Sequence, residues 1–169
     1  ENRLIDFDDM LSYTYELFKE RPDILALWQN KYKYILIDEF QDINRLQYEI
    51  IKMLAAPQNN LFIVGDDDQS IYRFRGSKPE IMLGFEKDYP DAKRILLDTN
   101  YRCGRYIVEA SLNLISHNRE RFDKKIIAAS KSKAPVTFAD FENRRDENIF
   151  LIRDIDKKIK AGAVFSDFA

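Results

Sequence analysis

The stretch YKYILIDEFQD, residues 32–42, changes abruptly from apolar to acidic side chains. The Ile-Leu-Ile run at 35–37 predicts a short strand that is buried on both faces, as in a parallel sheet. Parallel sheets bind ligands at the carboxyl ends of their strands, which is where Asp38 and Glu39 fall. In a nucleotide hydrolase, the first such carboxylate holds Mg²⁺ through water and the second accepts a proton from the attacking water. The same pattern also fits a strand that ends in a solvated acidic loop.

Two later segments repeat this change from apolar to polar residues. The run LFIV at 61–64 precedes GDDDQSIYRFRGS at 65–77, and the run RILL at 94–97 precedes DTNYRC at 98–103. Helical patterns separate the three apolar runs, so we expect three strands of one α/β parallel sheet with flanking helices. Their polar clusters should then converge on one rim of the sheet, as an active site requires.

Helix signals occupy much of the remaining chain. We expect a helix capped by Asp6 or Asp8 and interrupted at Pro22, and others from Asp23 to about Asn30, from after Asp42 to near Pro57, from Pro79 to before Pro90, after Arg102, and from after Glu142 to Gly162. The helix after Arg102 is too apolar to be exposed. Residues 119–133 are rich in Lys and Arg without a period, which predicts a solvated connector, and residues 136–139 predict a strand.

Composition excludes several classes of protein. The chain has 169 residues, of which 45% are hydrophobic and 33% charged, enough for the core of one domain or two small ones. No stretch approaches the roughly 18 apolar residues that a membrane span needs, and the sequence shows no charged-then-apolar leader pattern, so we expect a cytoplasmic protein without membrane contact. The single cysteine, Cys103, and the single histidine, His117, predict neither a disulfide scaffold nor a zinc site.

A net charge of −2 does not indicate a broadly basic surface, so any nucleic-acid binding must be local. Tyr72 and Phe74 alternate with Arg73 and Arg75. Such interleaving suits a single strand, because phosphates meet the cations while bases stack on the rings. An ordinary amphipathic loop has the same composition.

Together, the three polar clusters resemble motifs II, III and IV of superfamily 1 DNA helicases of the UvrD/Rep/PcrA type. The matching segments are DEFQD at 38–42, VGDDDQSIYRFRG at 64–76 and LDTNYR at 97–102, in that order. The resemblance is good over about residues 5–102 and looser beyond. The departures are Phe40, Phe74, Ser77 and Cys103, where the family usually has Tyr, Trp, Ala and Ser.

The resemblance implies a RecA-like P-loop NTPase sheet that uses ATP and Mg²⁺. It implies that Asp38 coordinates Mg²⁺ through water and that Glu39 orients and deprotonates the attacking water. By the same resemblance, Gln69 senses the γ-phosphate, Tyr101 stacks on adenine, and Arg102 acts as an arginine finger. Finally, it implies that single-stranded DNA contacts Tyr72, Phe74 and Arg75.

No Gly-x-x-x-x-Gly-Lys-Ser/Thr occurs in the sequence, so the phosphate-binding loop of P-loop enzymes is absent from it. In helicases of this type that loop lies upstream of motif II. We therefore expect an internal fragment, with the later half of a first RecA-like domain at 1–97 and the start of a second at 98–169. Such a fragment should hydrolyse no ATP by itself.

The parent protein is then expected to be an ATP-dependent DNA helicase or translocase that moves 3′-to-5′ on single-stranded DNA and acts at DNA junctions, in repair or replication. Two alternatives stay open. One is the helicase module of a helicase-nuclease, and the other is a nucleic-acid-binding remnant that no longer hydrolyses ATP.

Overall fold

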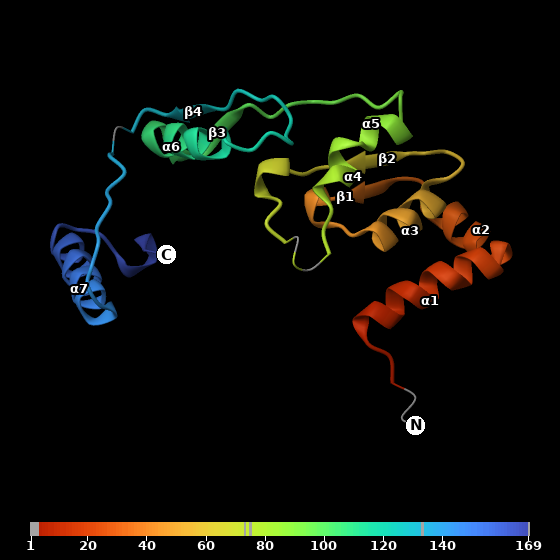
Figure 1. The fold of residues 1–169 in the computed structure, drawn as a ribbon, viewed down its shortest axis with the longest axis horizontal. Helices are drawn as coiled ribbons and strands as arrows, with labels where there is room; N and C mark the ends of the chain where they lie inside the picture. Colours follow the sequence, from red (N-terminus) through yellow and green to blue (C-terminus); the bar gives the residue numbers. More distant parts are fainter. Residues whose placement is uncertain (1–3, 73, 75, 133, 169) are drawn as a thin grey trace.

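The computed structural model describes residues 4–72, 74, 76–132 and 134–168 (Figure 1). The elements before the middle of the chain are α1 (Phe7–Glu20), α2 (Pro22–Lys31), β1 (Ile35–Ile37), η1 (Phe40–Asp42), α3 (Arg45–Ala55), β2 (Leu61–Ile63), η2 (Asp67–Gln69), α4 (Pro79–Leu83) and α5 (Phe85–Asp88). Those that follow are β3 (Thr99–Gly104), α6 (Arg105–Ile115), β4 (Ile127–Ser130), α7 (Arg144–Lys160) and η4 (Phe165–Asp167). The η elements are single 3-10 turns.

Local signals place the first helices where the sequence predicts them. The Asp6 carboxylate accepts the Asp9 backbone N–H at 2.8 Å, and the Asp9 carboxylate accepts that of Asp6 at 3.1 Å, which caps α1. Asn44 and Gln47 exchange the same pair of bonds at the start of α3. The helix expected over 79–90 is instead two short ones. Gly84 separates α4 from α5 with φ −91° and ψ 0°, and its N–H closes α4 by donating to the Glu80 carbonyl.

β1 and β2 pair in parallel, with Ile35 opposite Leu61 and Ile37 opposite Ile63. One face of this pair packs on the core, where Phe40, Tyr48, Ile81 and Phe85 are buried. The Phe40 ring meets the rings of Tyr48 and Phe85 edge-on, at centroid distances of 5.9 and 5.6 Å. The third residue of the DEFQD segment is therefore a core residue, and its apolar ring fits that position.

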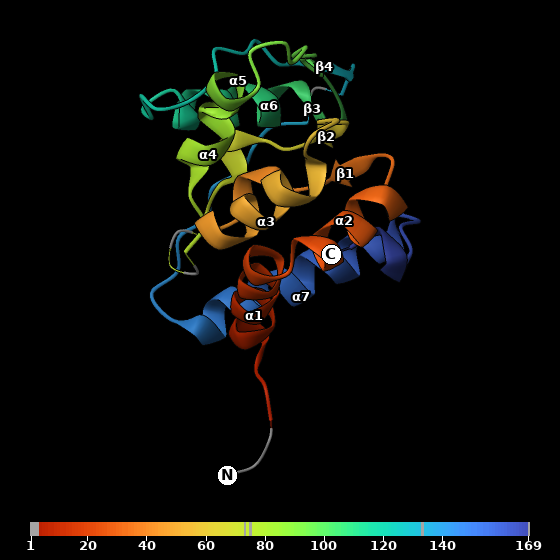
Figure 2. The ribbon, with the colours of Figure 1, turned by 90° about the vertical axis from the view of Figure 1, so that its right-hand side faces the viewer.

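The opposite face of the β1–β2 pair is open. Leu36 is 72% exposed and its neighbour Phe62 is also exposed, so the prediction of a strand buried on both faces is wrong for β1. The reason is that α3, α4 and α5 supply core residues on one face only. In both views α1 and α2 lie on the outer side of α3, which they contact (Figures 1 and 2).

The third strand of the predicted sheet does not form. Residues 94–97 have no regular structure and Ile95, Leu96 and Leu97 are exposed. The strand β3 begins later, at Thr99, and pairs in parallel with β4 rather than with β1 or β2. A strand requires a neighbour for its backbone hydrogen bonds. That neighbour is β4, which lies inside the stretch 119–133 that we expected to be a solvated connector.

The second sheet carries α6, which contacts both of its strands. Val108 of α6 is buried, but Ile107 and Leu114 are exposed, so the expectation of a fully buried helix is wrong. Residues 136–139 form no strand, and Phe138 is exposed. Every residue of α7 is at least partly exposed, and Figure 1 shows α7 apart from both sheets. In the described part of the chain, no helix is long and apolar enough to cross a bilayer.

Candidate nucleotide site at the ends of β1 and β2

The parallel pairing of β1 and β2 continues beyond the last residue of each strand. The Val64 N–H donates to the Ile37 carbonyl at 2.8 Å, and the Phe40 N–H donates to the Val64 carbonyl at 2.9 Å. These bonds hold the acidic segment after β1 beside the segment after β2. Glu39 lies in the chain between Ile37 and Phe40, the two residues that bond to Val64. Its backbone has φ 49° and ψ 42°, a left-handed conformation that is uncommon outside glycine and often marks functional sites. Its N–H donates to the Asp38 carboxylate at 2.9 Å.

One buried amide joins the two strand ends. The Gln41 side chain is almost fully buried, with 1% of the residue exposed. Its Nε2 donates to Glu39 Oε2 at 2.7 Å, and its Oε1 accepts the Asp66 backbone N–H at 3.0 Å. A Cβ on Gly65 would lie 2.6 Å from Gln41 Oε1 and 3.1 Å from the Phe40 backbone nitrogen, so any larger residue there would displace the Gln41 amide. The Gln41 amide therefore fixes the Glu39 carboxylate relative to the end of β2.

The same hydrogen-bond chain continues to Gln69. Gln69 Nε2 donates to Asp66 Oδ2 at 2.7 Å. The Ser70 hydroxyl donates to the Gln41 backbone carbonyl at 3.3 Å and adds a second link between the segments. Of the predicted site residues, the structure thus brings Asp38 and Glu39 close to Gln69, through Gln41 and Asp66.

Two cations from the segment after α6 neutralise the acids of the η2 turn. Lys124 Nζ donates to Asp66 and to Asp67 Oδ1, the latter at 2.6 Å, and lies 3.1 Å from Asp68 Oδ2. Arg121 holds Asp68 with two bonds, Nε to Oδ1 at 2.8 Å and Nη2 to Oδ2 at 2.7 Å.

These contacts outweigh the effect of burial on the charged groups of the cluster. Burial opposes ionisation of Asp66 and Asp68, yet the hydrogen bonds from Lys124, Gln69 and Arg121 leave the pKa of each carboxyl below its usual range. Burial likewise opposes the charge on Lys124, but its three carboxylate partners raise the pKa of the ammonium group. All three groups are therefore charged at neutral pH.

The predicted DNA-contacting loop lies beyond η2. The Tyr72 and Phe74 rings are 5.9 Å apart at an angle of 55°, and Phe74 is 77% exposed. Exposure excludes a core role for Phe74 in this chain. Arg75, the third residue of that prediction, and Arg73 lie outside the described residues. A groove of about 660 Å³ lies beside the end of the loop, and the cations that line it are Arg45, Lys78 and Lys87.

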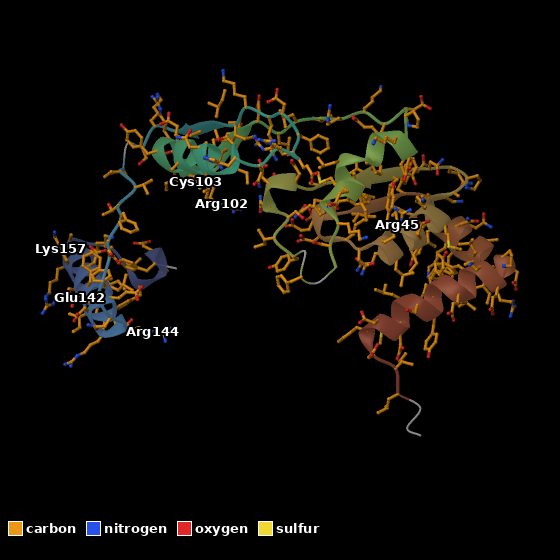
Figure 3. All side chains as sticks on the ribbon, viewed as in Figure 1. Arg45, Arg102, Cys103, Glu142, Arg144 and Lys157 are labelled. Atoms are coloured by element: carbon orange, nitrogen blue, oxygen red, sulfur yellow. The ribbon has the colours of Figure 1, made fainter. Side chains whose placement is uncertain are left out.

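The two residues predicted to contact ATP from the third cluster lie on the other sheet. Tyr101 and Arg102 are exposed residues of β3, and the Asn100 side chain accepts the Arg102 N–H at 2.9 Å (Figure 3). β3 is not a strand of the β1–β2 sheet, so these residues do not share its rim. Figure 1 shows the second sheet on the side toward which β1 and β2 run.

The carboxylates after β1 suit a magnesium ion that is bound together with phosphates. Mg²⁺ usually takes one or two protein carboxylates and completes its shell with water and phosphate oxygens. Asp38 is exposed at the strand end and offers such an oxygen. Within the described ranges, no group of three or more His, Cys, Asp and Glu side chains is arranged to hold a metal without other ligands.

Comparison with known proteins assigns the family. The model of the UvrD/REP helicase N-terminal domain matches residues 1–90. The chain belongs to the UvrD/REP helicase family. YjcD of Bacillus subtilis is 49% identical over 170 residues, which cover 100% of this chain and 22% of YjcD. The ATP-dependent DNA helicases PcrA of Staphylococcus aureus and Staphylococcus epidermidis are 41% and 40% identical over 168 residues, covering 99% of this chain and 23% of each relative. The chain thus spans less than a quarter of the length of these relatives.

For this UvrD/REP family chain, sequence reasoning missed the residues that connect the predicted site. Gln41 stands within the DEFQD segment, but a polar side chain in a segment with three acids gives no sign that it is buried. Asp66 is an ordinary member of an acidic run. Lys124 acts on carboxylates up to 58 residues earlier, and nothing in its local sequence indicates those partners. A Lys/Arg-rich segment opposite an unusually acidic turn is the one signal that could have suggested the pairing.

Proposed function

We propose that this chain is an internal segment of an ATP-dependent DNA helicase, and that it carries part of the site where ATP hydrolysis drives 3′-to-5′ movement along single-stranded DNA. Residues 1–97 then belong to a first RecA-like domain and residues 98–169 to the start of a second. The work of the parent protein is unwinding at DNA junctions in repair or replication. The segment by itself should not turn over ATP, because it lacks the amide cradle and lysine that bind the triphosphate.

The proposed roles at the site follow from the chemistry of each side chain. Asp38 would hold Mg²⁺ through water, and the ion would neutralise charge on the phosphate oxygens. Glu39 orients the attacking water and accepts its proton. Gln69 senses the γ-phosphate. Tyr101 stacks on adenine, and Arg102 meets the phosphates when the second unit closes on the first, a contact that can contribute ~10³ or more in rate.

The proposed DNA contacts are Tyr72, Phe74 and Arg75. Exposed rings stack on bases without sequence preference, and neighbouring cations meet the phosphates. The adjacent groove is lined by three cations, Arg45, Lys78 and Lys87, and by two acids, Glu80 and Asp88, so further phosphate contacts there would come from the cations alone. The loop follows directly after Gln69, so a change at the γ-phosphate has a short path to the DNA.

The observation that supports this proposal most strongly is the hydrogen-bond chain from Glu39 through Gln41 and Asp66 to Gln69. A solvated acidic loop would not need a buried amide to fix one of its carboxylates, nor a left-handed residue to aim it. The left-handed backbone costs stability, and residues in such conformations cluster at sites that perform chemistry.

A strand-displacement assay on the full-length protein tests the proposal. With ATP and Mg²⁺, the protein should unwind a duplex that carries a 3′ single-stranded tail, and its ATP turnover should rise when single-stranded DNA is added. A duplex with a 5′ tail and a non-hydrolysable ATP analogue are the controls, and neither should support unwinding. ATP turnover that DNA does not stimulate would contradict the helicase assignment, and equal unwinding from a 5′ tail would contradict the polarity.

A further inference from the structure

Two segments far apart in the chain meet at a cluster of charged groups. The first is the η2 turn with the residue before it, Asp66, in the unit built on β1 and β2. The second joins α6 to β4 and contributes Arg121 and Lys124, together with the Phe122 N–H, which donates to Asp67 Oδ2 at 2.8 Å. In Figure 1 the segment after β2 reaches toward the β3–α6 unit. This cluster therefore connects the two sheets.

Within the cluster, Asp66 has a divided role. Its Oδ2 accepts the Gln69 amide at 2.7 Å, while its Oδ1 accepts the Lys124 ammonium group and, at 3.2 Å, the Asp68 backbone N–H. The backbone N–H of Asp66 is the group that Gln41 holds, and Gln41 in turn holds Glu39. The Lys124 ammonium is thus separated from the Gln69 amide only by the Asp66 carboxylate. Asp66 and the buried Gln41 amide separate it from Glu39.

The position of the Lys124 ammonium group is fixed mainly by Asp67. The Lys124 side chain is 7% exposed and that of Asp67 is 2% exposed, so water replaces neither partner readily, whereas the Asp66 side chain is 40% exposed. Buried charges that lose a partner are costly, and the remaining groups rearrange to find another. Arg121 binds Asp68 alone among the three acids and so joins the two units without touching Asp66. Lys124 is the cation that acts on the partner of Gln69.

We infer that Lys124 is a positioning residue for Gln69, which it holds through Asp66 at the junction of the two sheets. The inference rests on the role proposed above for Gln69. It adds that the second unit influences the γ-phosphate-sensing side chain of the first. Displacement of the segment that carries Lys124 removes the cation that orients the Asp66 carboxylate, and the Gln69 amide bound to that carboxylate then shifts.

The test uses the full-length protein with Lys124→Met, which keeps the aliphatic length and removes the charge. We expect DNA-stimulated kcat for ATP to fall about 10-fold or more, because a small misplacement of a group at the reacting centre has effects of that order. The KM for ATP should change little. Lys124→Arg should recover most of the loss. Lys125→Met, an exposed neighbour, is the matched control and should keep wild-type turnover.

A double-mutant cycle separates positioning from general destabilisation. If Lys124 acts through Gln69, then Lys124→Met should cause little further loss of kcat in a Gln69→Ala background. The same fold loss in both backgrounds would overturn the inference. Asp66→Asn provides a second route if Lys124→Met fails to fold, since it keeps an oxygen for the Gln69 amide but weakens the attraction for Lys124. It should lower kcat in the same way, and unchanged kcat would again overturn the inference.

The experiments give different results if the proposed function is wrong and if only the role of Lys124 is wrong. If Gln69→Ala keeps wild-type turnover while Glu39→Gln abolishes it, the hydrolysis site stands, but the role of Gln69 and this inference are both wrong. If the wild-type protein shows no DNA-stimulated ATP turnover, the proposed function itself is contradicted before any variant is compared.

Discussion

At Gln41, a single buried amide satisfies a carboxylate and a backbone N–H that belong to the ends of two different strands. A glutamine is suited to this task because its side chain donates at one atom and accepts at the other. The Glu39 backbone takes a left-handed conformation beside it, and Gly65 leaves room for the amide oxygen. At the scale of single residues, the geometry of the candidate site therefore depends on hydrogen bonds that cannot be predicted from the sequence motif alone.

Phe74 gives the sharpest prediction for a single residue. Because its ring is exposed, Phe74→Ala in the full-length protein should weaken binding of single-stranded DNA by roughly 1–3 kcal/mol, the range for losing one base–aromatic contact. Phe74→Trp should restore or raise DNA affinity, because a larger ring overlaps more with a base. Fluorescence anisotropy with a labelled oligonucleotide measures both, and ATP affinity should hardly change.

The control for Phe74 is Phe138→Ala, which removes another exposed ring, far from the loop in sequence, and should leave DNA affinity unaltered. A core phenylalanine would instead show a loss of ~3–5 kcal/mol in stability on truncation. A large fall in the melting temperature of the Phe74→Ala protein, with unchanged DNA affinity, would remove Phe74 from the DNA site.

At the scale of elements, the sequence predicts what local chemistry determines. Asp6 caps α1, α1 ends before Pro22, Pro79 opens α4, and the apolar runs at 35–37 and 61–64 contribute the paired strands β1 and β2. These signals act within a few residues of the element itself. The polar clusters after β1 and β2 also lie side by side as the parallel pairing requires.

The elements that were predicted wrongly depend on distant partners. Residues 95–97 are as apolar as β1, but an apolar run forms a strand only when a neighbouring strand pairs with it, and β4 pairs instead with the residues that follow. The pairing of Lys124 with Asp66 and of Arg121 with Asp68 spans more than fifty residues. Charge pattern alone assigned these cations to solvent, because it contains no information on which surface they meet.

The η2 turn gives a prediction for pH. Since the pKa values of Asp66 and Asp68 are lowered in the folded chain, their contribution to stability is present above the unfolded value of roughly 3.9 and is lost as pH falls through the lower folded value. The pKa of Lys124 is raised, so its contribution is present below its ordinary value near 10.5 and is lost only at higher pH. The cluster should therefore be equally stable between about pH 5 and pH 9.

Urea unfolding of the chain and of its Lys124→Met variant, followed by circular dichroism, measures this dependence. The difference in the free energy of unfolding should be constant from about pH 5 to pH 9 and should shrink below about pH 4, as the carboxylates become protonated. Lys125→Met should differ little from the wild type at any pH. A difference that titrates near pH 7, or that persists unchanged at pH 3, would contradict the charged cluster.

At the scale of the whole molecule, the chain consists of two α/β units with a charged junction between them. One contains the proposed hydrolytic residues, and the other contains Tyr101 and Arg102 on a separate sheet. Such a division suits a nucleotide that is bound between two units, because residues from both can reach it only when the units close. If the chain is an internal segment of a longer helicase, as proposed above, we expect other parts of that protein to cover the open apolar face of the β1–β2 pair.

The central claim is that the ends of β1 and β2 hydrolyse ATP in the parent protein, and Glu39→Gln in that protein tests it most directly. The substitution keeps the size of the side chain and a partner for Gln41 but removes the proton acceptor. Affinity for a fluorescent ATP analogue should stay nearly unchanged while DNA-stimulated kcat falls by ~10² or more, because proton acceptance matters only as the water attacks. Glu16→Gln, an exposed position on α1, should leave both quantities at wild-type values. Equal losses of nucleotide affinity and of turnover in Glu39→Gln, or turnover that does not change, would contradict the account.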